Sequence, residues 1–525
     1  MRQAGLVVGM LALATSAAAQ EAGPAKPRFD FTGVSDEELW AAYEAAVARQ
    51  DEDYCGFLVP LLSQIETRGG ADRRVSIARS GAELECAIEQ QRWDVAYRQV
   101  KYLERAHGKL PALYAASIAR LAGALPDAST RLLEHIDAIE PDTAFKQESR
   151  ELWALSRAFA LAGRFAERLQ LLRDLAQEAR LGKMAEDDRR AILSALFAAE
   201  VEGGSVEAAA GLVANVRDPY TMRSALGDLR YAPLWPQLEA QAGDNLNLIL
   251  NAAVDEALAR YRSAPDDLQL FQELAHAYLH AGRFAEVIDL VEAKRPPPEK
   301  MAEIDENMAW ALNVEAYSLD ALGRADDAEA IFDQIAEIPF DAKEKGWLVN
   351  FAINRGSRLV ALGRFEKGLA AAELAGRIAE TSGSGYARML VRRDRICALT
   401  ALGRAAEAAP ILQEVDANID DTPHVAAEAL LCAKDEGKVA ALVIAELKDP
   451  AKAGEMIEAL QGPEFDLFYT SSVLPRLSKR IRPRKDVDAA FRKVARDIPA
   501  RFAPLFAKRR AELVAGGPGA QAPRR

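Results

Sequence analysis

The sequence predicts an all-α protein built from stacked helical hairpins. Half of its 525 residues are hydrophobic but only 7% are aromatic, and Ala and Leu dominate, which favours closely packed helices. Apolar residues recur at helical spacing, as at Phe271, Leu274, Ala275 and Tyr278. A short phrase that separates one apolar helical stretch from the next recurs along the chain. Together these three observations predict a helical repeat protein.

The recurring phrase is a glycine, then an arginine, then phenylalanine or alanine. Glycine ends a helix because it readily adopts the left-handed conformation that a chain reversal needs. In the second half of the chain, consecutive glycines of the phrase are separated by 41, 40, 40 and 34 residues. Such a period indicates a solenoid, because one hairpin cannot bury both its faces alone. The copies begin at Gly163, Gly282, Gly323, Gly363 and Gly403, with fainter ones at Gly437 and, without the glycine, at Gln91.

The clearest copy runs from Leu268 to about Arg295. Around its turn at Gly282 it has apolar Phe271, Leu274, Ala275, Tyr278 and Phe284. This pattern resembles the tetratricopeptide repeat family. The copy around Gly163 matches it with Leu152, Leu155, Ser156, Phe159 and Phe165.

The resemblance covers roughly residues 145–180 and 265–445 and implies a divergent, exported member with a helical-hairpin solenoid fold. Ala316 and Gly356 keep the small residue of the family pattern, whereas Ile396 is bulky at that place. The period of about 40 residues also exceeds the family's usual 34. Longer loops between divergent repeats account for the difference.

Two similar stretches of sequence, which we call the echo segments, predict the domain organisation. The stretch Arg-Tyr-Ala-Pro-Leu-Trp at 230–235 returns as Arg-Phe-Ala-Pro-Leu-Phe at 501–506. A proline near the start of a short helix suits the capping of a solenoid end. We therefore expect two consecutive arrays, each closed by such a segment. The expected parts are a signal peptide (1–19), a linker (20–30), an amino-terminal array (31–245), a tetratricopeptide-like array (246–475), a basic helical cap (476–515) and a disordered tail (516–525).

The first residues predict export. A short positive start, Met1-Arg2-Gln3, precedes an apolar stretch at 4–14 that is too short to span a bilayer, and Ala17-Ala18-Ala19 follows at a cleavage position. No cysteine follows the apolar stretch, so a lipoprotein is not expected. We expect a periplasmic protein whose mature chain begins near Gln20. An uncleaved anchor is the alternative.

The cysteines are four, an even number that favours disulfides in an oxidising compartment. Cys55 and Cys86 lie 31 residues apart, and Cys397 and Cys432 lie 35 apart, each spacing close to one hairpin. We expect disulfides within these two pairs. Four buried, reduced cysteines are the alternative.

The charge is uneven. Residues 476–525 contain 15 Lys and Arg against 4 Asp and Glu, a net charge of +11 in a chain of −13, so the rest carries −24. The excess could solubilise an array end, dock on the acidic body of the chain, or dock on an anionic membrane surface or acidic polymer. We expect docking on an anionic membrane surface or an acidic polymer, and no nucleic acid partner. The basic surface comprises Lys479, Arg480, Arg482, Arg484, Lys485, Arg492 and Lys493.

No motif for chemistry is present. His276 and His280 are four residues apart, but Ala277 stands where a metalloprotease would have its glutamate. The chain has no Gly-x-Ser-x-Gly elbow, Walker loop or dinucleotide fingerprint. We therefore predict no catalytic residue, metal or cofactor, and a binding protein rather than an enzyme.

The resemblance implies a binding surface. In the family, the first helix of each hairpin lines a concave groove that holds extended peptides or partner helices. Amides, imidazoles and aromatic rings suit that task. A merely solvated face is the alternative. Carried onto this chain, the predicted groove residues are Gln269, Gln272, His276, His280, Trp310, Asn313, Tyr317 and Asp320, with Leu279, Asn350 and Ser357 beside them.

Three functions fit these features. The first is a periplasmic scaffold or adaptor that binds a protein or peptide partner within an envelope machine. The second is a component of cell-wall or exopolysaccharide assembly. The third, a cell-wall enzyme with a solenoid body, is the weakest because no stretch resembles a compact catalytic domain.

Overall fold

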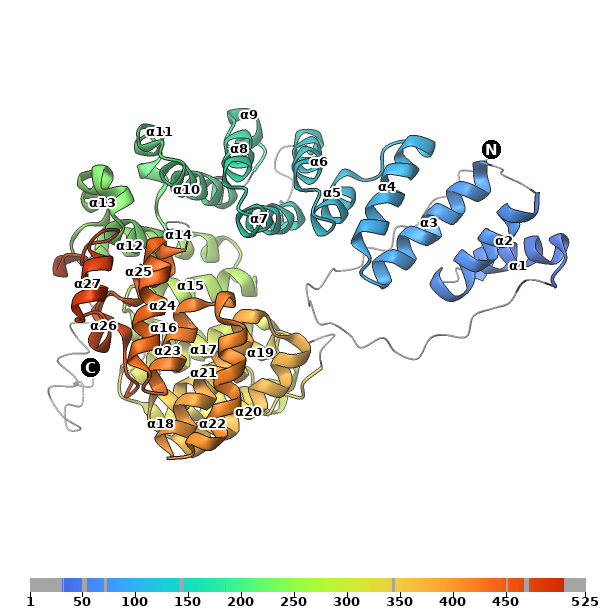
Figure 1. The fold of residues 1–525 in the computed structure, drawn as a ribbon. Coiled ribbons are helices and arrows are strands. Elements are labelled where there is room, and N and C mark those ends of the chain that lie inside the picture. The colour runs from blue at the N-terminus through green and yellow to red at the C-terminus, as the bar shows by residue number, and fades with distance from the viewer. Residues whose placement is uncertain are drawn as a thin grey trace. The chain divides into compact units, whose positions relative to one another are not determined.

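The computed structural model describes residues 31, 33–49, 54–69, 73–140, 146–184, 186–341, 345–449, 452–466 and 472–504. Throughout these ranges the regular structure is helical, apart from an isolated bridge between Asp228 and Ala495 (Figure 1). The expected signal peptide, linker and tail lie outside the described residues. No helix in the described ranges combines the length and apolarity that a bilayer crossing requires.

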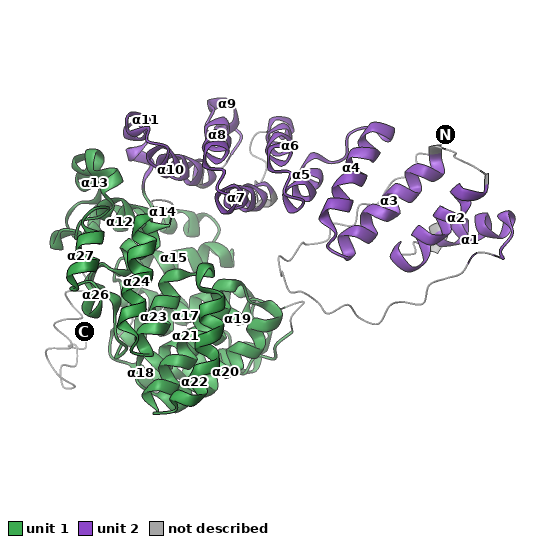
Figure 2. Ribbon diagram, in the orientation of Figure 1, with its two compact units in different colours: residues 1–19, 217–525 green, residues 20–216 purple. Residues whose placement is uncertain are grey.

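The chain forms two compact units (Figure 2). Unit 2 covers residues 20–216, and unit 1 covers residues 217–525 together with residues 1–19. The sequence analysis expected the division at 245/246, whereas the units divide at 216/217.

The described residues of unit 2 mostly form helices. In chain order they are α1 (Asp36–Arg49), η1 (Tyr54–Leu58), α2 (Val59–Gly69), α3 (Arg73–Glu89), α4 (Trp93–His107), α5 (Ala112–Leu121), α6 (Leu125–Ala138), α7 (Lys146–Leu161), α8 (Phe165–Leu175), α9 (Glu178–Leu181), α10 (Glu186–Glu202), α11 (Val206–Ala210) and η2 (Val213–Asn215).

Unit 1 begins with α12 (Pro219–Gly227), η3 (Leu229–Leu234), α13 (Trp235–Ala242), η4 (Asp244–Leu246) and α14 (Asn247–Ser263). Its hairpins follow as α15 (Leu268–His280) with α16 (Phe284–Glu292), η5 (Pro298–Glu303), α17 (Glu306–Ala321) with α18 (Ala325–Ala336), α19 (Leu348–Ala361) with α20 (Phe365–Ser382), α21 (Gly385–Ala401) with α22 (Ala405–Ala417), η6 (Ile419–Asp421), and α23 (Pro423–Cys432) with α24 (Glu436–Lys448). It ends with α25 (Ala453–Ala459), η7 (Pro463–Phe465), α26 (Leu477–Arg480), α27 (Lys485–Phe491) and η8 (Ala500–Phe502).

The hairpins share one turn conformation. Each turn contains a residue with φ between 54° and 79°, which we call the turn residue. The sequence analysis missed the turns at Gly123 and Gly204 because no arginine follows either glycine. The turn residues are Gln91, Gly123, Gly163, Gly204, Gly282, Gly323, Gly363, Gly403 and Lys434.

The arginine of the phrase has a structural role at both helices of a hairpin. In the clearest copy this arginine is Arg283. Its backbone N–H donates to the carbonyl of Tyr278 at 2.8 Å, which satisfies a free carbonyl at the end of α15. Its guanidinium then pairs with Glu286 in the first turn of α16, with 2.9 Å between Nε and Oε1. The hairpin at Gly323 repeats both contacts, through Leu319 and Asp327. The phrase therefore encodes a turn that ends one helix and starts the next.

One turn differs from the expectation. The last hairpin turns at Lys434, whose φ is +66°, and Gly437 lies in the first turn of α24. The N–H of Asp435 donates to the carbonyl of Leu430 at 3.1 Å, so Asp435 takes the place of the arginine there. The faint copy at Gly437 is thus displaced by three residues from the true turn.

Two substitutions test this assignment. Lys434→Gly should stabilise the protein by about 1 kcal/mol, because it removes a side chain from a left-handed position. Gly437→Ala should also stabilise it, by roughly 0.5–1 kcal/mol, because alanine is the better helix former. Denaturant unfolding measures both. A loss of stability in Gly437→Ala would instead place the turn at Gly437.

Both expected disulfides are present in the structure. Cys55–Cys86 joins η1 to α3, and Cys397–Cys432 joins α21 to α23, each with Cα atoms 4.9 Å apart. That separation lies within the usual range for a disulfide. The second bond links the first helices of two consecutive hairpins.

Unit 1 closes on itself, because its first helices bond to its last ones (Figure 1). Arg496 forms the centre of the closure. Its backbone N–H donates to the carbonyl of Gly227 and its Nε to that of Leu226, at 2.8 and 2.7 Å. Its guanidinium also bonds Glu239 at 2.8 Å and covers the ring of Trp235 at 3.4 Å.

The echo segments take part in this closure. Asn245 donates its side-chain amide to the carbonyl of Ala503 at 2.7 Å, and Arg501 pairs with Glu239 at 2.5 Å. The stretch at 230–235 therefore lies near the start of unit 1, where we expected it to end a separate array. The described part of the second stretch, 501–504, bonds Glu239 and Asn245, so the two similar stretches belong to the two ends of one unit and do not close two separate arrays.

The basic segment is integrated into unit 1. Leu477, Ile481, Val487 and Phe491 are buried in a core that they share with α24 and α25. Several arginines are paired within the chain, Arg480 with Glu436, Arg482 with Asp488 and Asp497, and Arg492 with Asp488. Asp488 and Asp497 belong to the basic segment itself, whereas the pairs of Arg476 with Asp466, of Arg480 with Glu436, and of Arg496 and Arg501 with Glu239 join the segment to the rest of the chain. These latter pairs agree with the alternative that the segment docks on the acidic body. Arg482 is 8% exposed, so the prediction of a surface residue is wrong there.

Candidate functional site

The first helices of the hairpins in unit 1 share one face. Residues 2, 6 and 10 positions before a turn residue lie on the same side of a helix, because four residues make about one turn. We call these positions the groove register. They hold Gln272, His276 and His280 in α15, Asn313, Tyr317 and Ala321 in α17, Ile353, Ser357 and Ala361 in α19, Arg393, Cys397 and Ala401 in α21, and His424, Glu428 and Cys432 in α23.

A row of rings crosses this face from α12 to α17. Tyr220 of α12 packs edge-on against His280, with 5.3 Å between ring centroids and 3.2 Å between the Tyr220 hydroxyl and Nε2 of His280. His276 lies 6.2 Å from His280 and 6.1 Å from the ring of Trp310. All four side chains keep part of their surface exposed. We call these four residues the ring stripe.

The ring stripe carries no charge at neutral pH. Burial and, to a smaller extent, the neighbouring His276 together lower the pKa of His280 to about 4. Burial also lowers the pKa of His276, against the effect of its hydrogen bond to the Gln272 carbonyl. Burial raises the pKa of Tyr220 to about 12. Neutral imidazoles and a phenol can donate and accept hydrogen bonds, so the stripe suits an uncharged polar surface such as a peptide backbone.

Gln269 and Gln272 extend the predicted groove beside the stripe. Gln269 is exposed and reaches Glu273 at 3.1 Å, and Gln272 contacts Nδ1 of His276 at 3.0 Å. Trp310 packs on the buried Phe351 with 4.8 Å between centroids. Of the predicted groove residues, Gln269, Gln272, His276 and His280 of α15 and Trp310 of α17 thus lie together and accessible. Leu279 is 1% exposed and belongs to the core, so the prediction is wrong for that residue.

The prediction is wrong for Asn313 and Tyr317 as accessible groove residues. Asn313 is 0% exposed and its Oδ1 accepts from Asn354 of α19 at 3.2 Å. Tyr317 is 6% exposed, and its ring packs on Phe332 of α18 at 5.7 Å. The physical reason is that α17 is buried almost all round, so its groove register fills the space between neighbouring helices.

Asp320 also has a structural partner. Both of its carboxylate oxygens accept from Arg358 of α19 at 2.6 Å, and Arg358 is almost completely buried. Arg358 donates further to the carbonyl of Ala325 at 3.0 Å. The predicted groove residue Asp320 therefore ties consecutive hairpins together.

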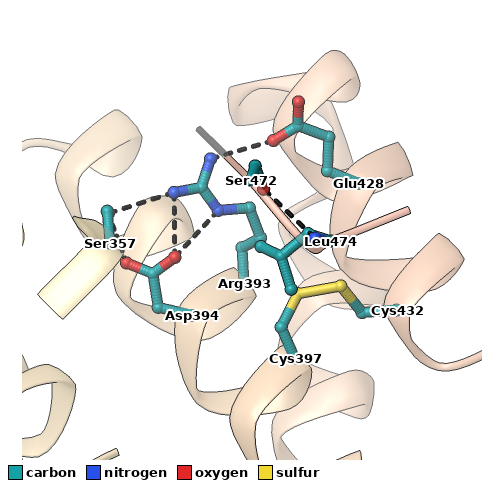
Figure 3. The surroundings of a disulfide bond; sticks show 8 residues. All are labelled: Ser357, Arg393, Asp394, Cys397, Glu428, Cys432, Ser472 and Leu474. Carbon is teal, nitrogen blue, oxygen red and sulfur yellow. Dashed lines mark hydrogen bonds and ion pairs between the residues drawn. A yellow bond between two sulfur atoms is a disulfide. The ribbon is translucent and has the colours of Figure 1, made fainter. Parts of the chain in front are cut away.

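Across α19, α21 and α23, three half-buried residues of the groove register, Ser357, Arg393 and Glu428, form a polar network with the buried Asp394 (Figure 3). Arg393 bonds Asp394 at 2.8 Å, Ser357 at 3.1 Å and Glu428 at 2.9 Å. Ser357 donates to Asp394 at 2.5 Å. Burial raises the pKa of Asp394, while Arg393 and Ser357 lower it. Sequence reasoning proposed Ser357 alone, since no local pattern shows that charged groups pair between hairpins.

The chain itself covers the next part of this face. Residues 472–476 have no helical structure, and Val473 donates its N–H to the carbonyl of Ala361 at 2.8 Å. Leu474 packs against the core cluster that contains Cys397 and Cys432. Figure 3 shows Leu474 beside this disulfide. The sequence analysis did not foresee this contact.

Within the described ranges, no group of three His, Cys, Asp or Glu side chains lies close enough to hold a metal ion. The two histidines of α15 pair with each other and with neighbouring polar groups.

Fold and face together define a helical-repeat protein of the tetratricopeptide-like class. No protein-family model matches the chain, and no curated protein matches its sequence. Among solved structures, it is similar to a chain in the crystal structure of the APC/C hetero-tetramer Cut9–Hcn1, with 11% identity over 82% of this chain and 97% of that chain. The TM-score of 0.19 is low, so the class rests on the hairpins described above.

Proposed function

We propose that this protein is a periplasmic scaffold that binds a protein or peptide partner through the first helices of unit 1. The observation that carries the proposal is the ring stripe, in which four partly exposed rings from three helices adjoin one another. Rigid aromatic and imidazole rings give contact area at low entropy cost. Gln269 and Gln272 add amide groups at the edge of the stripe.

Site-specific cross-linking tests this proposal. A photoreactive residue at Gln272 should give a discrete protein adduct in living cells, whereas one at the exposed Asp289 of α16 should not. Trp310→Ala should reduce the Gln272 adduct, because truncating a central aromatic anchor typically weakens binding about 10- to 100-fold. Equal adducts at Gln272 and Asp289, or no effect of Trp310→Ala, would contradict the proposal.

The periplasmic location has its own test. The short apolar stretch and the three alanines at 17–19 support cleavage of a signal peptide. Amino-terminal sequencing of protein released by osmotic shock should find a chain that begins near Gln20. Residues 1–19 on the released protein would contradict export by cleavage.

The basic segment supports a second, weaker attachment to an anionic surface. Lys479, Lys485 and Lys493 are exposed, whereas several neighbouring arginines are paired with acidic residues. Each lysine close to anionic lipid contributes about 1 kcal/mol. Replacing all three by glutamate should therefore reduce co-sedimentation with anionic vesicles by at least 10-fold in 0.1 M salt.

The matched control makes the same charge change at the exposed residues Lys300, Lys367 and Lys452. Equal loss of vesicle binding in both triple variants would show that net charge, and not this segment, is responsible. Truncation before residue 476 is unsuitable, because α26 and α27 supply buried core residues.

A further inference from the structure

Residues 472–476 lie against the groove register without helical structure, and the chain bends at Leu474, whose N–H donates to Oγ of Ser472 at 3.1 Å. Ser472, Leu474 and Arg476 are half-buried, whereas Val473 and Pro475 are exposed. Alternate residues of the segment therefore face the helices. This part of the protein therefore shows how its own face accepts a peptide.

The helices beneath the segment supply a hydrogen-bond acceptor and an apolar contact surface for Leu474, which we call the apolar seat. The acceptor is the carbonyl of Ala361, which lies at the end of α19 and bonds the N–H of Val473 at 2.8 Å. The carbonyls at the end of a helix have no partner within it, so another chain segment can use them. The seat for Leu474 is the cluster around the Cys397–Cys432 disulfide.

The turn at Gly363 also lies close to the Val473 side chain. A Cβ at the turn residue Gly363 would lie 3.4 Å from Cγ2 of Val473, so the turn approaches the segment within van der Waals contact. Pro475 has no N–H and leaves no donor unsatisfied on the exposed side. Arg476 pairs with Asp466 at 3.1 Å, which holds the end of the segment.

We propose that the groove register of α19, α21 and α23 is a binding site for a short non-helical peptide that donates one backbone N–H to the Ala361 carbonyl and places the next, apolar side chain against the Cys397–Cys432 cluster. The chain's own residues 472–476 occupy this site, and a partner peptide of the same chemistry displaces them. The inference rests on the proposed function, because it places the partner on the same row of first helices. The inference adds two details: the chemistry of the partner peptide, and its docking on α19, α21 and α23 among the first helices of the hairpins.

Residues 472–476 are attached weakly enough for a partner peptide to replace them. One backbone hydrogen bond, from Val473 to Ala361, joins this segment to the face, and the Val473 side chain is 66% exposed. A tethered segment competes at an effective concentration in the millimolar range. A free peptide should therefore bind weakly to the unmodified protein and tightly to a protein whose own segment has been released.

Fluorescence anisotropy with a labelled peptide of residues 470–477 tests this. The protein variant is Leu474→Asp, which puts a charge on the apolar seat and should release the segment. The peptide should bind this variant at least 10-fold more tightly than it binds the unmodified chain. A peptide methylated on the Val473 nitrogen, or one carrying Leu474→Asp, should lose at least 10-fold in affinity for the same variant.

Equal affinity for both proteins, or no binding to a Leu474→Asp variant with an unchanged circular dichroism spectrum, would overturn the proposal. If the Leu474→Asp variant unfolds, amide hydrogen exchange in the unmodified chain tests instead whether the peptide displaces residues 472–476. Excess unlabelled peptide should speed exchange at 472–476, and unchanged exchange would overturn the proposal. The cross-linking test at Gln272 concerns the other end of the row, so the two proposals can fail separately.

Discussion

Replacing Arg496 by alanine is expected to destabilise unit 1 by about 3–5 kcal/mol, the usual loss when one partner of a buried charge pair is removed. The guanidinium and its partner Glu239 are both about four-fifths buried, and the same side chain bonds the carbonyl of Leu226 and covers Trp235. All of these contacts join the first helices of the unit to its last ones. Their loss should leave the Leu226 carbonyl without this donor and Glu239 with the exposed Arg501 as its partner.

Arg501→Ala is the matched control. Arg501 pairs with the same Glu239, but its side chain is 56% exposed, so water screens the pair. Exposed pairs contribute about 0–1 kcal/mol, so this variant should stay within that range. Denaturant unfolding of the full chain measures both variants. Similar losses in the two would show that Arg496 contributes no more than a surface charge does.

Replacing Arg295 by alanine is expected to destabilise the protein by about 3–5 kcal/mol at pH 8 and by less at pH 5. Glu315 of α17 is 0% exposed and is paired with Arg295. Burial raises the pKa of Glu315 to about 7, while Arg295 lowers it. Without Arg295 the Glu315 carboxyl group must at pH 8 either stay charged and unpaired or take up a proton, and both are costly in a buried site.

The sign of the pH dependence follows from the raised pKa. Because the folded protein binds the Glu315 proton more tightly than the unfolded chain does, this group contributes its full stability below about pH 4.5. That contribution is lost as the pH rises through about 7, and amounts to about 3 kcal/mol. In Arg295→Ala the loss should continue to higher pH.

Glu315→Gln separates the charge from the packing. The amide has nearly the same shape and does not titrate, so this variant should lack the decline between pH 4.5 and 7. The double variant Arg295→Ala/Glu315→Gln should recover much of the stability lost in Arg295→Ala at pH 8. An equal effect of Arg295→Ala at pH 5 and pH 8 would mean that Glu315 is not the group responsible.

The fold could be predicted from the sequence because the repeat phrase is local. Glycine, the following arginine and the apolar spacing act within one hairpin, so Phe271, Leu274 and Tyr278 are buried as expected. The disulfides followed from spacing close to one hairpin. The turn at Lys434 was not predicted, because lysine, unlike glycine, does not indicate a left-handed backbone conformation.

The site could be predicted only in part, since exposure depends on neighbours far along the chain. His276 and Tyr317 occupy the same register, yet Tyr317 is buried because Phe332 and Asn313 lie against it. Tyr220 joins the ring stripe from a helix outside the recognised repeats. The occupant of the groove register, residues 472–476, comes from a segment more than 100 residues after Ala361. No periodic pattern encodes such pairings.

The closure of unit 1 constrains how such a protein can change. In an open row of repeats, each hairpin contacts only its neighbours, so copies can be duplicated or lost at little cost. Here Arg496 must reach Leu226, 270 residues earlier in the chain, across the hairpins between them. An inserted or deleted hairpin would move one end away from the other and break several bonds at once. The number of repeats in this unit is therefore set by its circumference, and variation should be confined to loop lengths and surface residues.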